Sequence, residues 1–297
     1  MSIRRRGRAR KSLGQNWLID RAALNRISKA AQITDDETVI EIGAGTGLLT
    51  GLLAERARRL IAVEVDEALA ARLGEGFATN DTVRVLERDV LETTPEELLM
   101  AGDGRVPYVV VGNLPYFIGT AIIRRFLYAQ IRPRWLIVTL QAEVAERIAA
   151  PPGRMSYLSV EMQTLASARL LFYLPPRAFK PAPKVRSAVV RLDVLDTGEV
   201  EVDDRKAFLA LARAGFAAPR KQLRNSLAVG LRIQASEADA MLSRAGVDRE
   251  QRPASLTLAD WQEVYFAWRS LERGASSQEP GANAGSREPK VETERVG

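Results

Sequence analysis

The alternation of strand-like and helix-like segments between Thr38 and Leu140 is the feature that most restricts how this chain can fold. Short runs rich in Val and Ile recur there, and the stretches between them carry apolar residues at helical spacing. This alternation predicts a parallel β-sheet with helices on both faces, because parallel strands need a crossover that a helix supplies. The strands are expected at residues 38–43, 59–66, 82–89, 107–113 and 134–140, and the helices at 46–57, 68–77 and 119–131.

The same pattern continues for about 55 residues and then gives way to helices alone. Two more helices are expected at 141–150 and 159–168, and two more strands at 169–174 and 185–195, which makes seven strands. The segments 204–216, 220–231, 236–246 and 257–271 all have helical periodicity. Ser236 and Thr257 are the expected N-caps, and Gly246 is an expected helix stop.

The change near residues 196–203 predicts a domain boundary. From Gly274 onward, Val291 and Val296 are the large apolar residues, so this tail is expected to be disordered. The expected organisation is a basic N-terminal segment at 1–19, an α/β domain at 20–197, a small all-α domain at 198–273 and the tail at 274–297.

The chain of 297 residues contains neither cysteine nor histidine. This excludes disulfides, thiol nucleophiles, a Ser-His-Asp triad and the usual zinc sites. No apolar run approaches the roughly 18 residues of a membrane span, and no secretory signal is recognisable. A protein without membrane association, acting in the cytoplasm, is therefore expected.

The first strand runs into EIGAGTG, residues 41–47. A strand, a glycine-rich turn and a helix form a nucleotide site at the carboxyl edge of an α/β sheet. No G-K-[ST] follows, which excludes a P-loop, and Leu48 stands where a dinucleotide fingerprint has Gly or Ala. Glu64 and Asp89 end the next two strands, where carboxylates can bind ribose hydroxyls and an adenine amine. Together these features predict a site for an adenosine-containing cofactor.

Charge distinguishes the candidate cofactors. A dinucleotide carries a pyrophosphate, whereas S-adenosylmethionine (AdoMet) carries a sulfonium cation and an ammonium group but no phosphate. Glu41 before the glycine turn and the acids on the following strands suit these cations. AdoMet is therefore favoured over NAD.

The fourth strand ends in NLPYF, residues 113–117, at the same edge of the sheet. An exocyclic adenine amine is a poor nucleophile because its lone pair is delocalised into the ring. Acceptors aimed at its two N–H groups would localise that lone pair. The side-chain oxygen of Asn113 and the carbonyl of Leu114 or Pro115 can serve, while Pro115 fixes the turn and the Tyr116 ring can stack on the base. This chemistry requires no histidine and no metal.

At this point the sequence resembles the ribosomal RNA adenine N6,N6-dimethyltransferases of the KsgA type, which act on the small subunit. The resemblance spans about residues 10 to 270 and rests on nine segments: KSLGQNWLID (11–20), EIGAGTG (41–47), VEVD (63–66), RDV (88–90), NLPY (113–116), QAEVAERI (141–148), FKPAPKVRSAVV (179–190), RKQLRNSL (220–227) and RPASLTLADW (252–261). It implies a Rossmann-like AdoMet-dependent methyltransferase domain and a small helical RNA-binding domain. The implied reaction is the dimethylation of N6 on two adjacent adenosines near the 3′ end of 16S rRNA in the 30S particle, with a role in small-subunit biogenesis.

The resemblance also implies roles for single residues. Asn16, Leu18, Gly43, Glu64, Asp89 and Asn113 would line the cofactor site. Phe179 would pack against the target base across from Tyr116, and the segment GQNWLID would cover the methionine end of AdoMet. Trp17 and Phe117 depart from the family pattern, in which Phe and Asn are usual, and Pro219 replaces one residue of a basic pair.

The net charge of +6 equals the charge of the first twelve residues alone. A polyanionic partner is favoured over a merely solubilising tail. The residues expected to contact RNA are Arg4, Arg5, Arg6, Arg8, Arg10 and Lys11 in this segment and Arg220, Lys221 and Arg224 in the helical domain. A monomer is expected.

Three other functions compete. An Erm-like methylase of 23S rRNA would share the chemistry, but the KSLGQN start and the helical domain with RKQLRNSL favour the KsgA type. A catalytically idle assembly factor is disfavoured by the intact Asn113, Pro115 and Tyr116. An NAD-dependent oxidoreductase is disfavoured by Leu48 and by the absence of residues for hydride chemistry.

Overall fold

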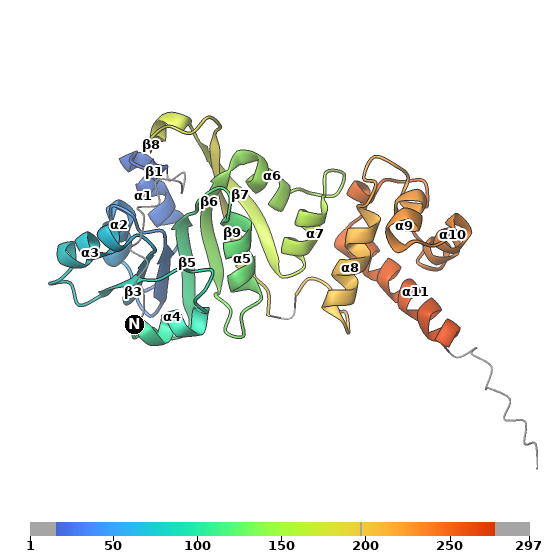
Figure 1. Cartoon of the computed structure of the whole chain (residues 1–297), viewed down its shortest axis with the longest axis horizontal. Helices are drawn as coiled ribbons and strands as arrows, with labels where there is room; N and C mark the ends of the chain where they lie inside the picture. Colours follow the sequence, from blue (N-terminus) through green and yellow to red (C-terminus); the bar gives the residue numbers. More distant parts are fainter. Residues whose placement is uncertain (1–15, 197, 277–297) are drawn as a thin grey trace, which may run out of the picture.

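A seven-stranded sheet forms the centre of the computed structural model, which describes residues 16–196 and 198–276 (Figure 1). The strand order is β4-β3-β2-β5-β6-β9-β7, and β9 runs antiparallel to both of its neighbours. The remaining pairs, from β4 to β6, are parallel, so the expected mostly parallel sheet is confirmed. The strands are β2 (Thr38–Ile42), β3 (Arg59–Glu64), β4 (Val83–Glu87), β5 (Tyr108–Asn113), β6 (Trp135–Gln141), β7 (Ala166–Leu174) and β9 (Ser187–Val194).

Helices cover both faces of this sheet, as the alternation predicted. Successive side chains of a strand point to opposite faces, and accordingly Val110 packs in one apolar cluster while Val109 and Val111 pack in another. The first cluster includes residues of α4 (Pro95–Ala101), α5 (Gly119–Leu127), α6 (Ala142–Ile148) and α7 (Tyr157–Gln163). The second includes residues of α1 (Arg21–Ala30) and α2 (Leu48–Ala54), and α3 (Glu67–Gly76) follows β3.

A two-stranded antiparallel ribbon stands at one edge of the molecule. It pairs β1 (Trp17–Leu18) with β8 (Phe179–Lys180), and Leu18 lies opposite Phe179. The backbone N–H groups of Ile19 and Asp20 also donate to the carbonyl of Ala178, in the short 3₁₀ helix η1 (Pro176–Ala178). The ribbon therefore ties the segment before α1 to the connection between β7 and β9.

The C-terminal helices form a unit with an apolar core of its own. This unit contains α8 (Arg205–Gly215), α9 (Leu223–Leu231), α10 (Ala235–Arg244), the 3₁₀ helix η2 (Pro253–Ser255) and α11 (Leu258–Ser276). Met155 and Val160, from the loop before α7 and from α7 itself, belong to the same apolar cluster. The backbone N–H of Gly153 also donates to the carbonyl of Ala254, so the sheet domain and the helical unit share both apolar and polar contacts.

The ends of α10 and α11 can be compared with the caps that the sequence predicted. Thr257 accepts from the N–H of Asp260 and is confirmed as a cap. Gly246 has a φ of +66° just beyond α10, as a helix stop requires. The prediction for Ser236 was wrong: α10 begins at Ala235 with Gln234 as its N-cap, so Ser236 lies inside the helix, and the Gln234 backbone N–H donates to Oε2 of Glu237.

The C-terminal helix also extends further than expected. α11 continues to Ser276, three residues past the expected end of the helical domain at 273. The rest of the expected tail and residues 1–15 lie outside the described part of the chain. Across residues 16–196 and 198–276, no helix combines the length and the apolar character that crossing a membrane would require.

Candidate active site

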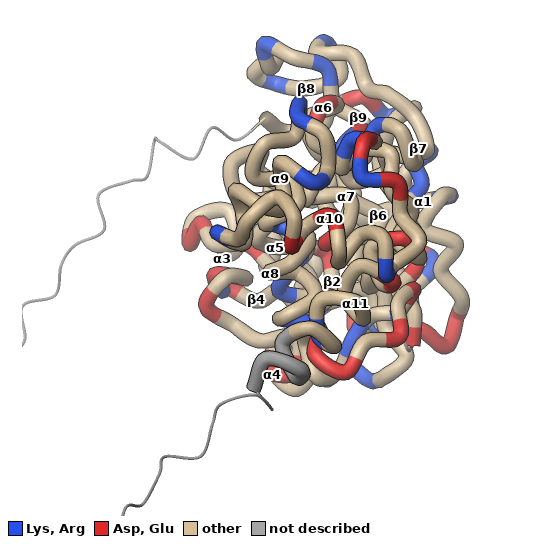
Figure 2. The backbone as a smooth tube through the Cα atoms, turned by 90° about the vertical axis from the view of Figure 1, so that its right-hand side faces the viewer, with Lys and Arg blue, Asp and Glu red and all other residues tan. Residues whose placement is uncertain are grey.

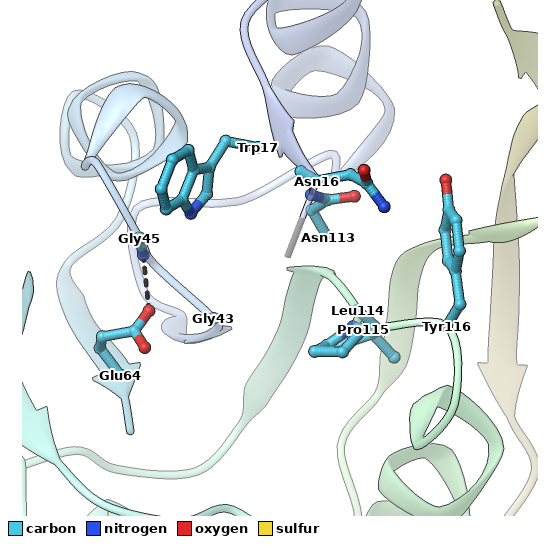
Figure 3. A pocket seen from close by; sticks show the side chains of 9 residues that line it. All are labelled: Asn16, Trp17, Gly43, Gly45, Glu64, Asn113, Leu114, Pro115 and Tyr116. Atoms are coloured by element: carbon cyan, nitrogen blue, oxygen red, sulfur yellow. Dashed lines mark hydrogen bonds between the residues drawn. The ribbon is translucent and has the colours of Figure 1, made fainter. Parts of the chain in front are cut away.

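A cavity opens at the carboxyl edge of β2, β3 and β5 (Figure 3). Its walls come from β1 and the residue before it, the glycine turn, the end of β3 and the NLPY turn: Asn16, Trp17, Gly43, Gly45, Glu64, Asn113, Leu114, Pro115 and Tyr116. The structure therefore brings together seven of the residues that the sequence singled out as cofactor-binding or catalytic, and it adds Trp17 and Gly45.

The glycine turn has a backbone that side chains rarely permit. Gly43, Gly45 and Gly47 have φ values of +71°, +54° and +79°. A Cβ on Gly45 would lie 3.3 Å from the Trp17 ring, so the indole covers the turn closely. A second hollow shares Trp17, Gly43, Gly45 and Asn113 with the first, and Leu18 and Glu41 line it. The expected cofactor residues other than Asp89 thus surround two adjoining hollows.

Glu64 is buried at the end of β3, and backbone groups hold its carboxylate. Its Oε2 accepts from the N–H of Gly45 at 2.9 Å, and its Oε1 accepts from the N–H groups of Val65 and Asp66. A carboxylate has about four lone-pair positions, so one remains for a ligand in the cavity. This geometry fits the expected hydrogen bond to a ribose hydroxyl and also rigidifies the turn.

Glu41 is buried beneath the glycine turn and lines the second hollow. Its Oε2 has no hydrogen-bond partner among the described residues. Burial raises the pKa of Glu41 to about 8; the nearby Thr50 hydroxyl lowers it in part, and the charge of Glu64 raises it further. A cation in this hollow would favour the ionised form of Glu41.

Asp89 does not line either hollow in this structure. It lies just beyond β4, where its Oδ1 accepts from the N–H of Leu91 at 2.9 Å. Its place after the third strand agrees with the sequence-based expectation, but its role toward an adenine remains a prediction.

Asn113 ends β5, and its amide is oriented by one hydrogen bond. Its Nδ2 donates to the backbone carbonyl of Asn16 at 2.9 Å. The amide nitrogen is thereby committed, which leaves Oδ1 as the group that can accept from a ligand. The carbonyl of Pro115 accepts from the N–H of Ile118 within the turn, so the Leu114 carbonyl is the better second acceptor of the two that the sequence left open.

Tyr116 follows on the same turn, and its hydroxyl is 2.6 Å from Oγ of Ser187. Burial raises the pKa of Tyr116, although the Ser187 hydrogen bond opposes this in part, so the phenol stays neutral. Ser187 is fully buried at the start of β9 and fixes where the ring stands. Reasoning from the sequence did not identify Ser187 as a functional residue, because RSAVV reads as the start of an ordinary strand.

Phe179 is not among the residues that line the two hollows. Its side chain is 3% exposed, and it packs in an apolar cluster with Leu18 and Leu24. The pairing of β8 with β1 places Phe179 opposite Leu18. Its contact with a target base stays a prediction.

Some of the residues expected to contact RNA lie within the part of the chain that the structure describes, and others lie outside it. Arg4, Arg5, Arg6, Arg8, Arg10 and Lys11 lie outside the described residues. Arg220 and Lys221 are exposed between α8 and α9, whereas Arg224 is half-buried and 3.8 Å from Asp239. The loop that carries β8, residues 175–186, holds four basic residues and no acid, and Figure 2 shows basic positions gathered around β8. This loop was not among the sequence-based candidates.

The strand order, the glycine turn after the first strand of the sheet and the acid that ends the next strand define a Rossmann-like methyltransferase. The sequence pattern of one family, ribosomal RNA adenine dimethylase, matches residues 6–267. The chain therefore belongs to this family and is an AdoMet-dependent rRNA adenine dimethyltransferase.

Individual relatives and solved structures agree with this family assignment. The ribosomal RNA small subunit methyltransferase A of Dehalococcoides mccartyi (strain BAV1) is 40% identical over 257 residues, covering 86% of this chain and 87% of the relative. The 23S rRNA methyltransferase ErmE has a TM-score of 0.69 and 29% identity, covering 85% of this chain and 99% of that one. A dimethyladenosine transferase from Plasmodium falciparum has a TM-score of 0.74 and 20% identity. The match covers 86% of this chain and 98% of that one, which supports the assignment of the fold.

Proposed function

We propose that this protein transfers methyl groups from AdoMet to N6 of two adjacent adenosines in a loop near the 3′ end of 16S rRNA, within the 30S subunit or its precursor, and so takes part in small-subunit biogenesis. The observation that carries the proposal is the Asn113 amide, which is fixed by the Asn16 carbonyl with its oxygen available beside Tyr116. The relative from Dehalococcoides mccartyi, named as a small-subunit enzyme, supports the choice of subunit.

The chemistry follows from the acceptors on the NLPY turn. Oδ1 of Asn113 and the Leu114 carbonyl accept from the two N–H groups of the target adenine. These bonds favour a pyramidal nitrogen and localise its lone pair, and they are preorganised because Pro115 and the Asn16 carbonyl hold the turn and the amide. N6 then bonds to the methyl carbon as the carbon–sulfur bond of AdoMet breaks, leaving S-adenosylhomocysteine, and the N6 proton leaves to solvent.

The two hollows suit the two ends of AdoMet. Glu64 has a free lone pair for the ribose, and Glu41 in the adjoining hollow matches a positive group. Asn16, Leu18 and Gly43 would line the rest of the AdoMet site, and Asp89 would bind the adenine amine. No metal enters this reaction scheme.

The target adenosine must be reached outside a stacked helix, so a loop is the fitting substrate. The helical unit from residue 198 would hold the surrounding RNA through Arg220, Lys221 and Arg224, and the basic residues 4–11 would bind phosphates. We further propose that the protein acts as a monomer in the cytoplasm, where ribosomes are assembled.

An Erm-like methylation of 23S rRNA is the second candidate, because ErmE shares the fold over most of both chains. The higher identity to the small-subunit enzyme, 40% against 29%, favours 16S rRNA. An idle assembly factor would not need the acceptor geometry of Asn113.

The test uses labelled AdoMet with 30S and 50S particles from cells that lack this modification. After digestion of the RNA, N6,N6-dimethyladenosine is expected from 30S particles. Label confined to 50S RNA would favour the Erm-like reaction. AdoMet binding without any labelled RNA would contradict both enzymatic proposals.

A further inference from the structure

The turn from Pro115 to Ile118 presents its two central aromatic residues in different ways. The hydrogen bond between the Pro115 carbonyl and the Ile118 N–H closes this turn. Tyr116 is half-buried, lines the cavity and is anchored to Ser187. Phe117, the next residue, is 63% exposed and lies outside the apolar clusters. The fold thus anchors one ring beside the cavity and leaves the ring of the next residue exposed to solvent.

Phe117 is more exposed than Tyr128 (47%) or Tyr173 (41%). Burial therefore does not account for an aromatic residue at this position. A second exposed apolar residue, Val185 (46%), lies two positions before Ser187, on the other segment that the Tyr116–Ser187 bond joins. Exposed apolar groups thus stand on both of the segments that this hydrogen bond joins.

We propose that Phe117 is a stacking platform for the nucleobase adjacent to the target adenosine. This inference rests on the proposed function, in which two neighbouring adenosines are modified. A target base that enters the cavity leaves its stack, and its neighbour then loses a stacking partner. A phenyl ring has no hydrogen-bonding group, so it can stack on any base without reading its identity. Phe117 directly follows Tyr116, so its exposed ring can meet the nucleotide next to a target base held beside Tyr116.

The experiment compares wild type, Phe117→Leu and Phe117→Tyr on undermethylated 30S particles. Phe117→Leu stays apolar but lacks the ring, whereas Phe117→Tyr keeps the ring. We expect Phe117→Leu to lower kcat/KM for the particle by about 5- to 100-fold, the range typical of one base–aromatic stack. Phe117→Tyr should stay close to wild type, and the AdoMet affinity of all three should be the same because Phe117 does not line the cofactor hollows.

A second substrate isolates the stack itself. In 30S particles in which one of the two adenosines is replaced by uridine, the smaller pyrimidine stacks over less area, so Phe117→Leu should lose less activity on the remaining adenosine. Tyr128→Leu makes the same change at an exposed aromatic residue at the far end of α5 and should behave as wild type.

Two results would overturn the stacking proposal alone. One is an active wild type with Phe117→Leu equally active. The other is a Phe117→Leu defect of the same size with adenosine and uridine neighbours, which would indicate a role in holding the turn. If the wild type itself failed to methylate 30S particles, the proposed function would fall, and this inference with it.

Discussion

Glu41 and Glu64 are two buried carboxylates under one glycine turn, and their surroundings differ. Glu64 receives three backbone N–H groups, whereas Oε2 of Glu41 has no partner among the described residues. Hydrogen bonds to a carboxylate stabilise its charge, and burial without them opposes it. Glu64 thus holds the turn through its hydrogen bonds, while a cation in the hollow would favour the ionised form of Glu41.

This difference predicts a pH dependence. The pKa of Glu41 is raised from 4.5 to about 8 in the folded protein. Between these values the unfolded chain loses a proton that the folded chain keeps, so stability should fall as pH rises, by up to about 1.4 kcal/mol per pH unit, and level off above pH 8. Denaturant unfolding of wild type and Glu41→Gln from pH 5 to 9 isolates this effect. Parallel stability curves for the two proteins would contradict it.

Ser187 supports a second prediction at the level of single residues. Ser187→Ala removes the partner of the Tyr116 hydroxyl. A ring that is no longer held in place should lower kcat by about 10-fold or more, while AdoMet affinity stays unchanged because Ser187 does not line the cavity. Ser28→Ala, at another buried serine with a hydrogen bond, to the Leu52 carbonyl, is the matched control. It should lose a little stability and no activity; equal loss of kcat in both variants would refute the positioning role.

A functional residue could be predicted from the sequence where it stands at the end of a strand or directly after it. Asn113, Glu64 and Gly43 stand at or directly after the ends of strands of a parallel sheet, and the carboxyl ends of such strands meet at one edge. Ser187 and Phe179 could not be placed in this way. Their environments depend on β8 pairing with β1 and on β9 lying between β6 and β7, which are contacts over long sequence distances.

At the level of elements, close helix contacts depend on particular glycines. A Cβ on Gly230, in α9, would lie 2.2 Å from the backbone carbonyl oxygen of Ala214 in α8. Backbone atoms cannot move aside as a flexible side chain does. The two helices therefore approach each other as closely as they do because position 230 has no side chain.

We accordingly expect Gly230→Ala to destabilise the protein by about 1–3 kcal/mol, the usual cost of forced overpacking. Gly51→Ala is the control: Gly51 lies in α2 with open space around its missing Cβ, so alanine should stabilise by about 0.4–1 kcal/mol. Thermal unfolding of both variants measures the contrast. Similar melting temperatures for the two would contradict the packing account.

The seven strands of the sheet were predicted from their apolar runs. The helix α4 (Pro95–Ala101) was missed, and the helix expected at 159–168 ends at Gln163, before β7 begins at Ala166. The strands that form the sheet carry apolar runs, so each could be expected within a few residues of its bounds. β1 and β8 have two residues each, which is too short for any period to show. The cap of α10 was misplaced because Ser236 satisfies a general preference, while the local geometry selected Gln234.

At the scale of the whole molecule, the distribution of charge predicts how strongly RNA binding depends on salt. Six basic residues stand within positions 4–11 and equal the net charge of +6. A cationic side chain that binds a phosphate displaces a counterion from the RNA, so removing such side chains should reduce the salt dependence of binding.

We therefore expect that replacing Arg4, Arg5, Arg6, Arg8, Arg10 and Lys11 by serine lowers the slope of log K for 30S particles against log salt by up to about 4, using roughly 0.7 per phosphate. Filter binding at several salt concentrations measures this slope. AdoMet affinity should not change. An unaltered slope would show that this segment does not contact RNA.

The central claim is that the oxygen of the Asn113 amide activates the adenine amine, and single-turnover methylation by Asn113→Ala tests it most directly. With saturating AdoMet and undermethylated 30S particles, formation of N6,N6-dimethyladenosine should slow by roughly 10²–10³-fold, while the melting temperature stays near that of wild type. An Asn113→Ala variant that folds and methylates at the wild-type rate would contradict the account.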